Sequence, residues 1–417
     1  MSMTAVILSI GDELVLGQVP ETNAGWLSAH LFERGVSTLY HKTIADDEAA
    51  TVKIVMEACK EADLVVITGG LGPTADDLTR QALAAVMGRP LDMHPPSLDR
   101  IRAFFRSLGR DMPPSNRIQA MAPRGADVLV NEWGTAPGIK LKHGNATVLA
   151  FPGVPHEMMK MAGRHLFPLL EHRTGAALAV KSLSTFGAGE STVAEKLGEL
   201  MRRDRNPLVG TTVSGGVVTV RIRCEAVTAV LAARKLGETV HAVQERLGAL
   251  IFSNDDETLA ETVGRLARER RVRIAVAESC TGGLAARMLT DPPGASMYFV
   301  GGWIVYSNDM KHSQLGVPLA MLEYSGAVSE ATACAMAAGA LDRSGADMAI
   351  GITGIAGPDG GSTEKPVGMV WIALAVRGGA GPVTRAECFR FPGDRSSVRD
   401  RAAKTALNLL RLELLKP

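Results

Sequence analysis

The sequence predicts an α/β protein built from three consecutive domains. Short apolar runs alternate with helical patterns over residues 5–170, a hairpin-rich segment follows near residue 178, and a second alternation begins near residue 258. Alternating strands and helices are typical of a parallel sheet covered by helices, and ligands on such sheets bind beyond the carboxyl ends of the strands. At roughly 100–200 residues per domain, this chain has room for two to four of them.

The first predicted domain covers residues 1–172. Its strands are expected at Val6–Ile10, Val36–Ile44 and Leu64–Thr68, and its helices at Asn23–Arg34, Glu48–Lys60 and Asp76–Met87. The third strand is a β-branched run that is followed directly by the glycine cluster 69–72, so a tight turn is expected at its carboxyl end.

The second predicted domain, residues 173–254, is a small α+β connecting module. Its elements are expected at Ser182–Phe186 (strand), Glu190–Met201 (helix), Gly210–Glu225 (hairpin) and Thr228–Leu247 (helix). No catalytic or metal-binding pattern is visible in it.

The third predicted domain covers residues 255–417. Helices are expected at Thr258–Arg270, Thr281–Leu289 and Arg395–Leu415, and strands at Val272–Ala277, Gly302–Tyr306, Met348–Thr353 and Met369–Val376. Three of its loops follow strands directly and carry polar or glycine-rich motifs, which makes this domain the more informative one for function.

Composition excludes several classes of protein. The 45 basic and 44 acidic residues nearly cancel, and aromatic residues make up only 4%, so neither a nucleic acid nor a membrane is expected as a partner. The five cysteines form no CxxC pair, which argues against a disulfide framework and a zinc site. Neither a signal peptide nor a transmembrane run is visible, so a cytoplasmic enzyme is expected.

The segment Ala277-Glu-Ser-Cys-Thr-Gly-Gly283 joins a predicted strand to a predicted helix. Ser279 on this turn is expected to lie beside unpaired helix N–H groups, which can hold an oxyanion. Ser279 is therefore a candidate nucleophile. The alternative is that Ser279 or Thr281 only caps the helix in front of two packing glycines.

This domain has three further candidate motifs, and the first two also follow predicted strands. The first motif is Tyr306-Ser-Asn-Asp-Met-Lys311. Its lysine can activate a serine without a histidine if burial lowers the pKa of the lysine. The alternative is that Lys311 is an exposed surface lysine. The glycine-rich loop 353–361 fits an anion or a flexible connector. Arg395 and Arg399, four residues apart, fit a phosphate clamp or a solvated helix face.

Taken together and in order, these four motifs resemble the C-terminal domain of the competence/damage-inducible protein A (CinA) family, whose stand-alone relatives are nicotinamide-nucleotide amidohydrolases. The resemblance implies a serine–lysine amidase that needs no cofactor, with Ser279 as nucleophile, Lys311 as base and Tyr306 in the same site. The residues that it implies for substrate binding are Glu278, Thr281, Gly282, Thr353, Gly354, Gly357, Arg395 and Arg399.

The N-terminal domain carries carboxylates after its first and third strands. If these strands are neighbours in a parallel sheet, Asp12, Glu13, Asp76 and Asp77 converge on one edge, where they fit a hard divalent cation over a pyrophosphate. Residues 68–72 would then offer backbone N–H groups to the phosphates. The alternative for Asp76 and Asp77 is favourable charge at a helix N-terminus.

The motif TGGLGPTADD, together with GDE, TNA, SNRIQ, GTAPG and FPGVPHE, is similar to the N-terminal half of the same family. That half resembles the three-layer molybdopterin-binding fold, and its members are associated with metal-dependent hydrolysis of ADP-ribose. The resemblance implies a divalent metal on Asp76 and Asp77. It implies a nucleotide site made of Gly11, Asp12, Glu13, Thr68, Gly69, Gly70, Gly72, Thr74 and Asn116.

The expected function is therefore bifunctional nucleotide turnover by a homodimer, with nicotinamide mononucleotide and ADP-ribose as its small-molecule partners. An alternative stays open for the N-terminal half, which is also consistent with a module that binds a pterin or nucleotide without hydrolysing it, because one fold hosts many functions.

Overall fold

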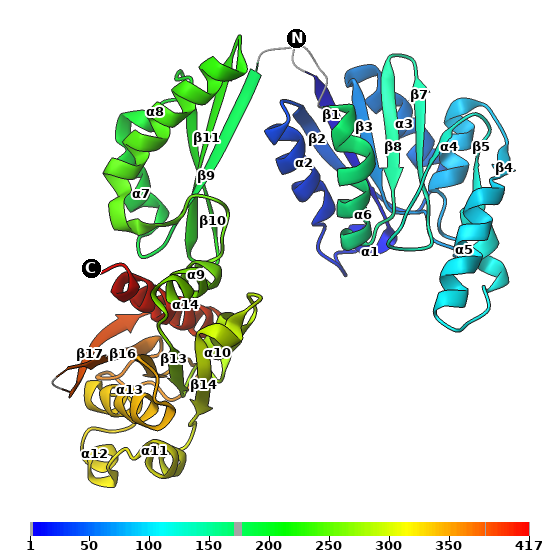
Figure 1. The fold of residues 1–417 in the computed structure, drawn as a ribbon. Helices are drawn as coiled ribbons and strands as arrows, with labels where there is room; N and C mark the ends of the chain where they lie inside the picture. Colours follow the sequence, from blue (N-terminus) through cyan, green and yellow to red (C-terminus); the bar gives the residue numbers. More distant parts are fainter. Residues whose placement is uncertain (1–2, 171–176, 380, 417) are drawn as a thin grey trace. The chain divides into compact units, whose positions relative to one another are not determined.

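The computed structural model describes residues 3–170, 177–379 and 381–416 (Figure 1). The chain divides into two compact units, Met1–Ala179 with Glu225–Ala232, and Val180–Cys224 with Ala233–Pro417. Most of the predicted middle module thus clusters with the C-terminal domain. The predicted boundary between residues 172 and 173 lies outside the described residues.

The first unit is built on a six-stranded sheet with the order β2-β1-β3-β8-β7-β6. Its strands are β1 (Thr4–Ile10), β2 (Ser37–Ile44), β3 (Leu64–Thr68), β6 (Asp127–Leu129), β7 (Gly138–His143) and β8 (Ala146–Phe151). The first four strands in this order run parallel to one another. β7 runs antiparallel to β8, and β6 runs antiparallel to β7. The expected all-parallel sheet is therefore wrong at this edge, where the two-residue turn between β7 and β8 makes a hairpin.

Helices cover both faces of this sheet and give three layers. They are α1 (Asp12–Val15), α2 (Asn23–Glu33), α3 (Glu48–Glu61), α4 (Thr79–Met87), α5 (Pro95–Ser107) and α6 (Pro155–Met161). α2 and α6 pack Leu27 and Met158 on one face, and α3 and α4 pack Val55 and Leu83 on the other. Because both faces are covered, β3 is buried at every position, which explains its continuous apolar run. The short pair β4 (Leu91–Met93) and β5 (Met121–Pro123) lies beside α5.

The middle module is a four-stranded sheet in the order β10-β11-β9-β12 with two helices. Its elements are β9 (Ala177–Thr185), α7 (Glu190–Leu197), β10 (Leu208–Ser214), β11 (Val217–Ala226), α8 (Ala229–Leu247) and β12 (Ile251–Ser253). Val193 and Val243 from the helices pack on Leu183 and Val220 from the sheet. The predicted hairpin around residues 214–216 is present.

The C-terminal domain is built on a five-stranded sheet with the order β14-β13-β15-β16-β17. Its strands are β13 (Ile274–Glu278), β14 (Phe299–Ile304), β15 (Met348–Gly354), β16 (Met369–Gly378) and β17 (Gly381–Arg390). β13 lies between β14 and β15 and runs parallel to both. β16 runs antiparallel to β15, and β17 runs antiparallel to β16. The carboxyl ends of three strands therefore meet at one edge, which is where ligands bind on open α/β sheets.

Two helical layers enclose this five-stranded sheet. The helices are α9 (Leu259–Arg270), α10 (Leu284–Thr290), α11 (Asn308–Leu315), α12 (Leu319–Tyr324), α13 (Glu330–Ser344) and α14 (Arg395–Leu414). α9, α10 and α14 cover one face, and α11, α12 and α13 cover the other. Polar side chains fix the helix starts: Thr258 and Glu261 form a capping box on α9, and Asp394 caps α14 through the N–H of Ser397.

Several predicted element boundaries are corrected by the structure. The helix expected from Asp76 begins at Thr79, the helix expected from Thr281 begins at Leu284, and the strand expected over Gly302–Tyr306 covers Phe299–Ile304. β17 was not predicted, because charged and small residues interrupt its apolar alternation.

Candidate active sites

Ser279 lies at the carboxyl end of β13, at the edge where three strands end. Its backbone N–H donates to the carbonyl of Ile352 on β15 at 2.9 Å, and on the other side the N–H of Val305 donates to the carbonyl of Glu278 at 2.8 Å. The turn is thus held by both neighbouring strands. Ser279 is 8% exposed and is therefore largely buried at the sheet edge.

Lys311 meets Ser279 from the first helix after β14. Its Nζ lies 3.2 Å from the Ser279 Oγ and donates to the carbonyls of Val305 and Tyr306, each at 3.1 Å. The residue is only 1% exposed, and this burial lowers the pKa of its ammonium group. In the neutral amine two N–H bonds stay on the carbonyls, so the lone pair faces the serine hydroxyl, which then donates to Nζ.

Glu278 closes the turn after Ser279 rather than facing a ligand. The residue is fully buried, and its carboxylate accepts the N–H groups of Gly283, Ala285 and Ala286 at 2.8–3.1 Å. The start of α10 is therefore already occupied by a negative charge. This corrects two expectations, because Glu278 is not available to bind substrate and these helix N–H groups are not available to an oxyanion.

Two other backbone N–H groups are left for an oxyanion. Among the described residues, neither the N–H of Cys280 nor that of Thr281 donates to a carbonyl or carboxylate. The hydroxyl Oγ1 of Thr281 is also buried without a hydrogen-bond partner in this part of the chain. These polar groups flank Ser279, which is where a donor to a developing negative oxygen must lie.

A second layer of polar contacts joins Tyr306, the glycine loop and α14. Arg395 donates from NH1 to the carbonyl of Gly357 at 2.8 Å and from NH2 to the Tyr306 hydroxyl at 3.0 Å. Arg399 donates to the carbonyl of Thr281 at 2.8 Å. The predicted residues Tyr306, Gly357, Arg395 and Arg399 are therefore brought together around the Ser279 turn.

The remaining predicted residues of this domain shape the site through the backbone. The Thr353 hydroxyl donates to the carbonyl of Ala327 at 2.6 Å, so it fastens a loop. Gly354 leaves no room for a side chain, since a Cβ there would lie 2.7 Å from the carbonyl oxygen of Met369. Gly282 has a φ of +60°, which favours glycine, and it lies beside Arg399.

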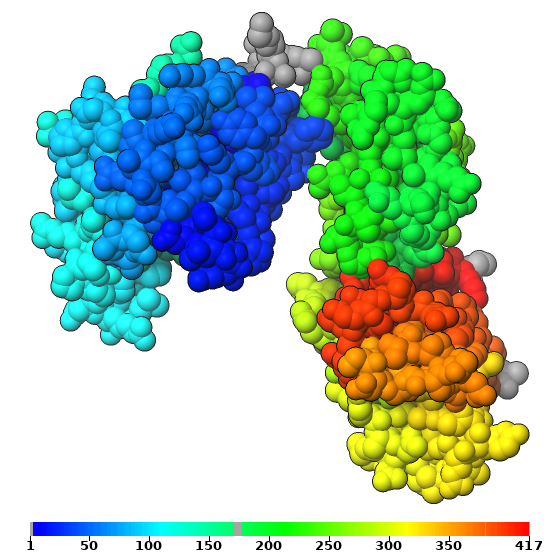
Figure 2. All heavy atoms as spheres, turned by 180° about the vertical axis from the view of Figure 1, so that it is seen from behind, coloured from blue at the N-terminus to red at the C-terminus, as the bar shows by residue number. Residues whose placement is uncertain are grey.

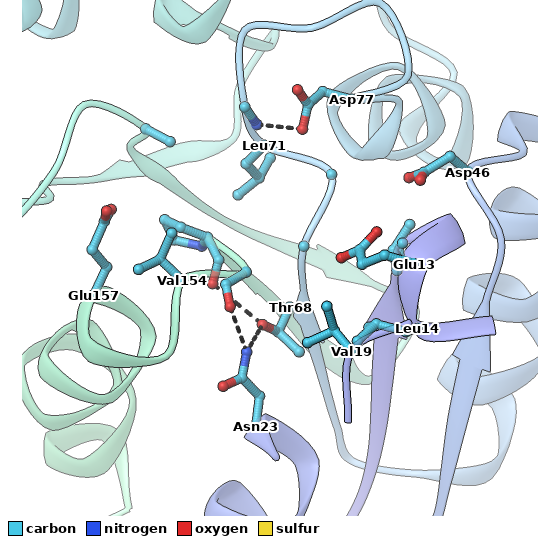
Figure 3. Close-up of a pocket in the computed structure, with 18 of the residues that line it drawn as sticks. Glu13, Leu14, Val19, Asn23, Asp46, Thr68, Leu71, Asp77, Val154 and Glu157 are labelled. Atoms are coloured by element: carbon cyan, nitrogen blue, oxygen red, sulfur yellow. Dashed lines mark hydrogen bonds between the residues drawn. The ribbon is translucent and has the colours of Figure 1, made fainter. Parts of the chain in front are cut away.

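The first unit contains a cavity of about 580 Å³ at the carboxyl ends of β1, β3 and β8 (Figure 3). Most of the predicted nucleotide-site residues line it, namely Gly11, Glu13, Thr68, Gly69, Gly70, Gly72, Thr74, Asp76 and Asp77. Asp12 and Asn116 do not line it. Asn116 is buried nearby and donates to Gln119, which does reach the cavity.

The glycine loop after β3 offers fewer N–H groups than expected. The N–H of Gly69 donates to the carbonyl of Phe151 at 3.0 Å, and that of Gly72 donates to Asp77 Oδ1 at 2.6 Å. Gly69 also passes so close to β1 that a Cβ would lie 2.0 Å from the Ile10 carbonyl oxygen. Within the described part of this loop, Gly70 and Leu71 keep N–H groups without an acceptor.

Asp77 holds its own loop together. Its carboxylate accepts the N–H of Gly72, the N–H of Thr74 at 2.8 Å and the Thr74 hydroxyl. α4 begins at Thr79, so Asp77 lies two residues before the first residue of the helix. Asp76 is exposed, and a hydrogen bond from Thr74 lowers the pKa of its carboxyl group.

Asp46 is a cavity residue that sequence analysis missed. Its Oδ2 accepts the N–H of Asp12 at 2.8 Å, and Asp12 Oδ1 accepts the N–H of Asp46 at 3.0 Å. Burial, together with the nearby carboxylates of Asp12, Glu13 and Asp76, raises the pKa of Asp46. A signal was present, since Asp46 follows β2 at the same sheet edge at which Asp12 follows β1.

Two further missed residues come from motifs that drew attention only as family signatures. Asn23 donates from Nδ2 to the Thr68 hydroxyl at 2.9 Å and to the Gly153 carbonyl at 2.8 Å, and it lines the cavity. Glu157 lies on the opposite side of the cavity from Glu13 and Asp46 (Figure 3). Burial raises the pKa of Glu157, whose Oε2 accepts from Asn131 at 2.6 Å.

The cavity is strongly acidic. Its lining carboxylates are those of Glu13, Glu21, Asp46, Asp76, Asp77 and Glu157, and its described lining includes neither lysine nor arginine. The buried Arg80 beneath the loop donates to the carbonyls of Leu71 and Gly72. These carboxylates repel an anionic group, and the N–H groups of Gly70 and Leu71 are the free backbone donors that the described loop offers to one.

The described residues contain no group of three or more histidine, cysteine or acidic side chains arranged to hold a metal ion. Nor is any helix in the described ranges both long and apolar enough to cross a bilayer.

Three family comparisons match successive parts of the chain. Residues 6–172 match the probable molybdopterin binding domain, residues 180–253 the damage-inducible protein CinA KH domain, and residues 256–414 the CinA C-terminal domain.

Similar proteins extend over the full length. A protein of Symbiobacterium thermophilum, named as a competence-damage inducible protein, is 43% identical over 99% of both chains. A CinA-like protein of Geobacter sulfurreducens is 41% identical over 99% of this chain and 100% of its own. The crystal structure of the competence/damage inducible protein CihA from Agrobacterium tumefaciens is 41% identical, covers 40% of this chain and 98% of its own, and has a TM-score of 0.37.

Proposed function

Because the chain belongs to the CinA family, we propose that its C-terminal domain hydrolyses the carboxamide of nicotinamide mononucleotide, with Ser279 as nucleophile and Lys311 as base. One observation carries the proposal: a buried lysine lies 3.2 Å from a serine hydroxyl and has its other two hydrogen-bonding directions taken by backbone carbonyls. Such a lysine is oriented by the fold, and burial lowers the pKa of its ammonium group.

The chemistry follows from these positions. The Ser279 hydroxyl passes its proton to Lys311 Nζ as Oγ bonds to the amide carbon, and the amide oxygen takes up the negative charge. The N–H groups of Cys280 and Thr281 are the donors available to that oxygen. The C–N bond then breaks, Lys311 returns the proton to the departing ammonia, and water releases the acid from the Ser279 ester through the same base.

Arg395, on the next layer of the site, is proposed to bind the phosphate of the nucleotide. It is exposed, it carries a charge that no carboxylate among the described residues pairs with, and its present partners are neutral oxygens of Gly357 and Tyr306. A phosphate would offer stronger, charge-assisted hydrogen bonds than these partners do.

The test is to incubate the full-length protein with nicotinamide mononucleotide and to identify the products. We expect ammonia and nicotinic acid mononucleotide in equal amounts, with no requirement for metal. Release of free nicotinamide instead would mean that the glycosidic bond is cleaved and would contradict the proposal. Ser279→Ala is the matched inactive control.

We further propose that the N-terminal cavity hydrolyses ADP-ribose to AMP and ribose 5-phosphate with a divalent metal. The acidic lining without lysine or arginine supports this, because a metal ion would offset the repulsion between these carboxylates and a pyrophosphate. The donor set consists of carboxylate oxygens and fits a hard cation such as Mg²⁺, which typically uses one or two protein carboxylates plus substrate phosphates. Asp46 and Asp76 are the two carboxylates proposed to hold it together with the substrate phosphates, and the bound metal would polarise the phosphoryl oxygens.

The second candidate for this half is a module that binds a nucleotide or pterin without hydrolysing it. Asp77 favours this alternative, because its carboxylate is fully engaged in its own loop instead of facing a metal. Metal-stimulated release of AMP from ADP-ribose would support hydrolysis. Saturable binding of ADP-ribose without any product would support the binding module.

A further inference from the structure

A second cavity lies within the C-terminal unit, away from the Ser279 turn. Its volume is about 490 Å³, which is within the range of small-molecule sites, and its walls come from the middle module and from β17 and α14. Figure 2 shows the same junction from behind, where the surface of the middle module meets α14 and β17.

This junction is fastened by polar contacts on either side of the cavity. Lys404 on α14 donates to the carbonyl of Gly215 at 2.8 Å, and Arg411 donates to the carbonyls of Ala249 and Ile251 at 2.6 and 3.0 Å. Hydrogen bonds from side chains to backbone carbonyls therefore hold the two walls of the cavity together.

Aromatic side chains provide most of the apolar lining. Phe389 and Phe391 on or next to β17 lie with their ring centroids 5.7 Å apart and their planes within 7°, and Phe186 lines the cavity from the middle module. Three phenyl rings around a space of this size fit a flat aromatic molecule, which gains both buried area and ring–ring contact.

The polar lining selects among aromatic molecules. Arg401 reaches the cavity from α14 and makes no ion pair with any carboxylate in the described part of the chain. One and two turns further along the helix lie Thr405 and Asn408, which are 8% and 9% exposed; Asn408 accepts from Arg411 with Oδ1, and its Nδ2 has no acceptor among the described residues. Arg401, Thr405 and Asn408 therefore offer hydrogen-bond donors to the cavity from one helix, and the Arg401 guanidinium carries the positive charge.

Two carboxylates also line the cavity, and one of them, Glu190, has a partner. Glu190 accepts the Thr211 hydroxyl at 2.8 Å and lies in the first turn of α7, where a negative charge is favourable. Glu387 is exposed to solvent on β17. Among the described residues neither Glu387 nor Arg401 forms an ion pair, and Arg401 is the cation of the lining that a bound carboxylate could pair with.

We propose that this cavity is a binding site for a planar aromatic carboxylate, whose ring lies among Phe186, Phe389 and Phe391 and whose carboxylate pairs with Arg401. Nicotinate is the probe, and nicotinamide is its uncharged counterpart with the same ring. The choice of this pair rests on the proposed function, which turns a ring carboxamide into a ring carboxylate; the binding site itself does not.

The experiment is isothermal titration calorimetry on the full-length Ser279→Ala protein, so that no turnover contributes heat. We expect nicotinate to bind about tenfold or more tightly than nicotinamide, as a charge-assisted pair with arginine implies. Arg401→Met keeps the aliphatic stem and should remove this preference. Val213→Trp, at a half-exposed position on the cavity wall, should fill the space and abolish binding.

Two controls separate this site from the rest of the molecule. Val383→Trp makes the same change at an exposed position of β17 outside the cavity and should leave binding intact. Arg395→Ala should also leave it intact, because Arg395 belongs to the proposed amidase site. Absence of nicotinate binding, or binding that Arg401→Met and Val213→Trp both leave unchanged, would overturn the proposal, whether or not the amidase activity is found.

Discussion

At the scale of single residues, the choice of nucleophile lies between Ser279 and its neighbour Cys280. Cys280 is 5% exposed, and burial raises the pKa of its thiol to about 12. A thiol with such a pKa stays protonated and is a poor nucleophile at neutral pH. Ser279 is the residue whose side chain meets a base, so the local environment favours the weaker intrinsic nucleophile.

We therefore predict that Ser279→Ala and Lys311→Ala each reduce deamidation by about 10³-fold or more, and that the double variant is little worse than either, because the pair acts as a unit. Ammonia release under single-turnover conditions measures this. Cys280→Ala is the control and should retain near-normal activity. If thiol alkylation or Cys280→Ala abolished activity, the serine assignment would be wrong.

The buried lysine also predicts the direction of the pH dependence. Catalysis needs the neutral amine, and burial lowers the pKa of Lys311 from 10.5, so the active fraction grows as pH rises through the lowered pKa. We expect kcat for deamidation to rise with pH, to level off at a pH below 10.5, and to be lost in Lys311→Arg. A profile that falls across the same range would exclude Lys311 as the base.

At the scale of elements, the turn from β13 to α10 depends on one buried carboxylate. Glu278 satisfies three backbone N–H groups, and glutamine would bring a donor where only acceptors fit. We expect Glu278→Gln to lower the free energy of unfolding by about 2 kcal/mol, as for a lost hydrogen bond to a charged group. Urea denaturation measures this, with the exposed Glu323→Gln as control. An unchanged midpoint would mean that the turn holds without Glu278.

The contact of α14 with the glycine loop predicts how Arg395 acts. A phosphate clamp away from the amide binds ground state and transition state alike, so Arg395→Ala should raise KM about tenfold and change kcat by less than about threefold. Steady-state kinetics with nicotinamide mononucleotide separate the two constants. Arg390→Ala, at an exposed position of β17, is the matched control. A fall in kcat at constant KM would instead place Arg395 at the reacting amide.

Element boundaries marked by local residue types, such as glycine clusters, could be predicted from the sequence. Boundaries that depend on contacts formed only in the folded chain could not. β3 matches its prediction because a β-branched run lies between Asp63 and a glycine cluster. The start of α10 was wrong by three residues, because positive φ angles at Gly282 and Gly283 and the Glu278 carboxylate delay the helix.

The same distinction holds for the sites. The motifs and the resemblance predicted Ser279 and Lys311 as a catalytic pair. Their contact depends on β13 and β14 being parallel neighbours, which the motifs alone do not specify. The backbone carbonyls that orient the lysine cannot be predicted from side-chain types. Asp46 was not predicted although it follows a predicted strand, because the loop after β2 lacks the glycines that mark the loops after β1 and β3.

At the scale of the whole molecule, the two proposed activities lie in separate compact units and should be separable. We predict that Asp46→Asn reduces ADP-ribose hydrolysis about 10²-fold or more and leaves deamidation unchanged, since asparagine keeps an acceptor for the Asp12 N–H but loses the charge for the metal. A chelator should give the same pattern. Product analysis with both substrates is the measurement, and the exposed Asp99→Asn is the control. Equal loss of both activities would mean that the sites are coupled.

Arg411 shows how closely the last helix is tied to the module that precedes its domain. Its guanidinium is 2% exposed and donates to the carbonyls of Ala249 and Ile251, both of which lie before residue 255. Cutting the chain at that point would remove both acceptors and leave a charged side chain on newly uncovered apolar surface. A self-standing enzyme derived from this domain would therefore lose both contacts and expose the surface that they hold covered, so the junction limits how this chain can be taken apart and recombined.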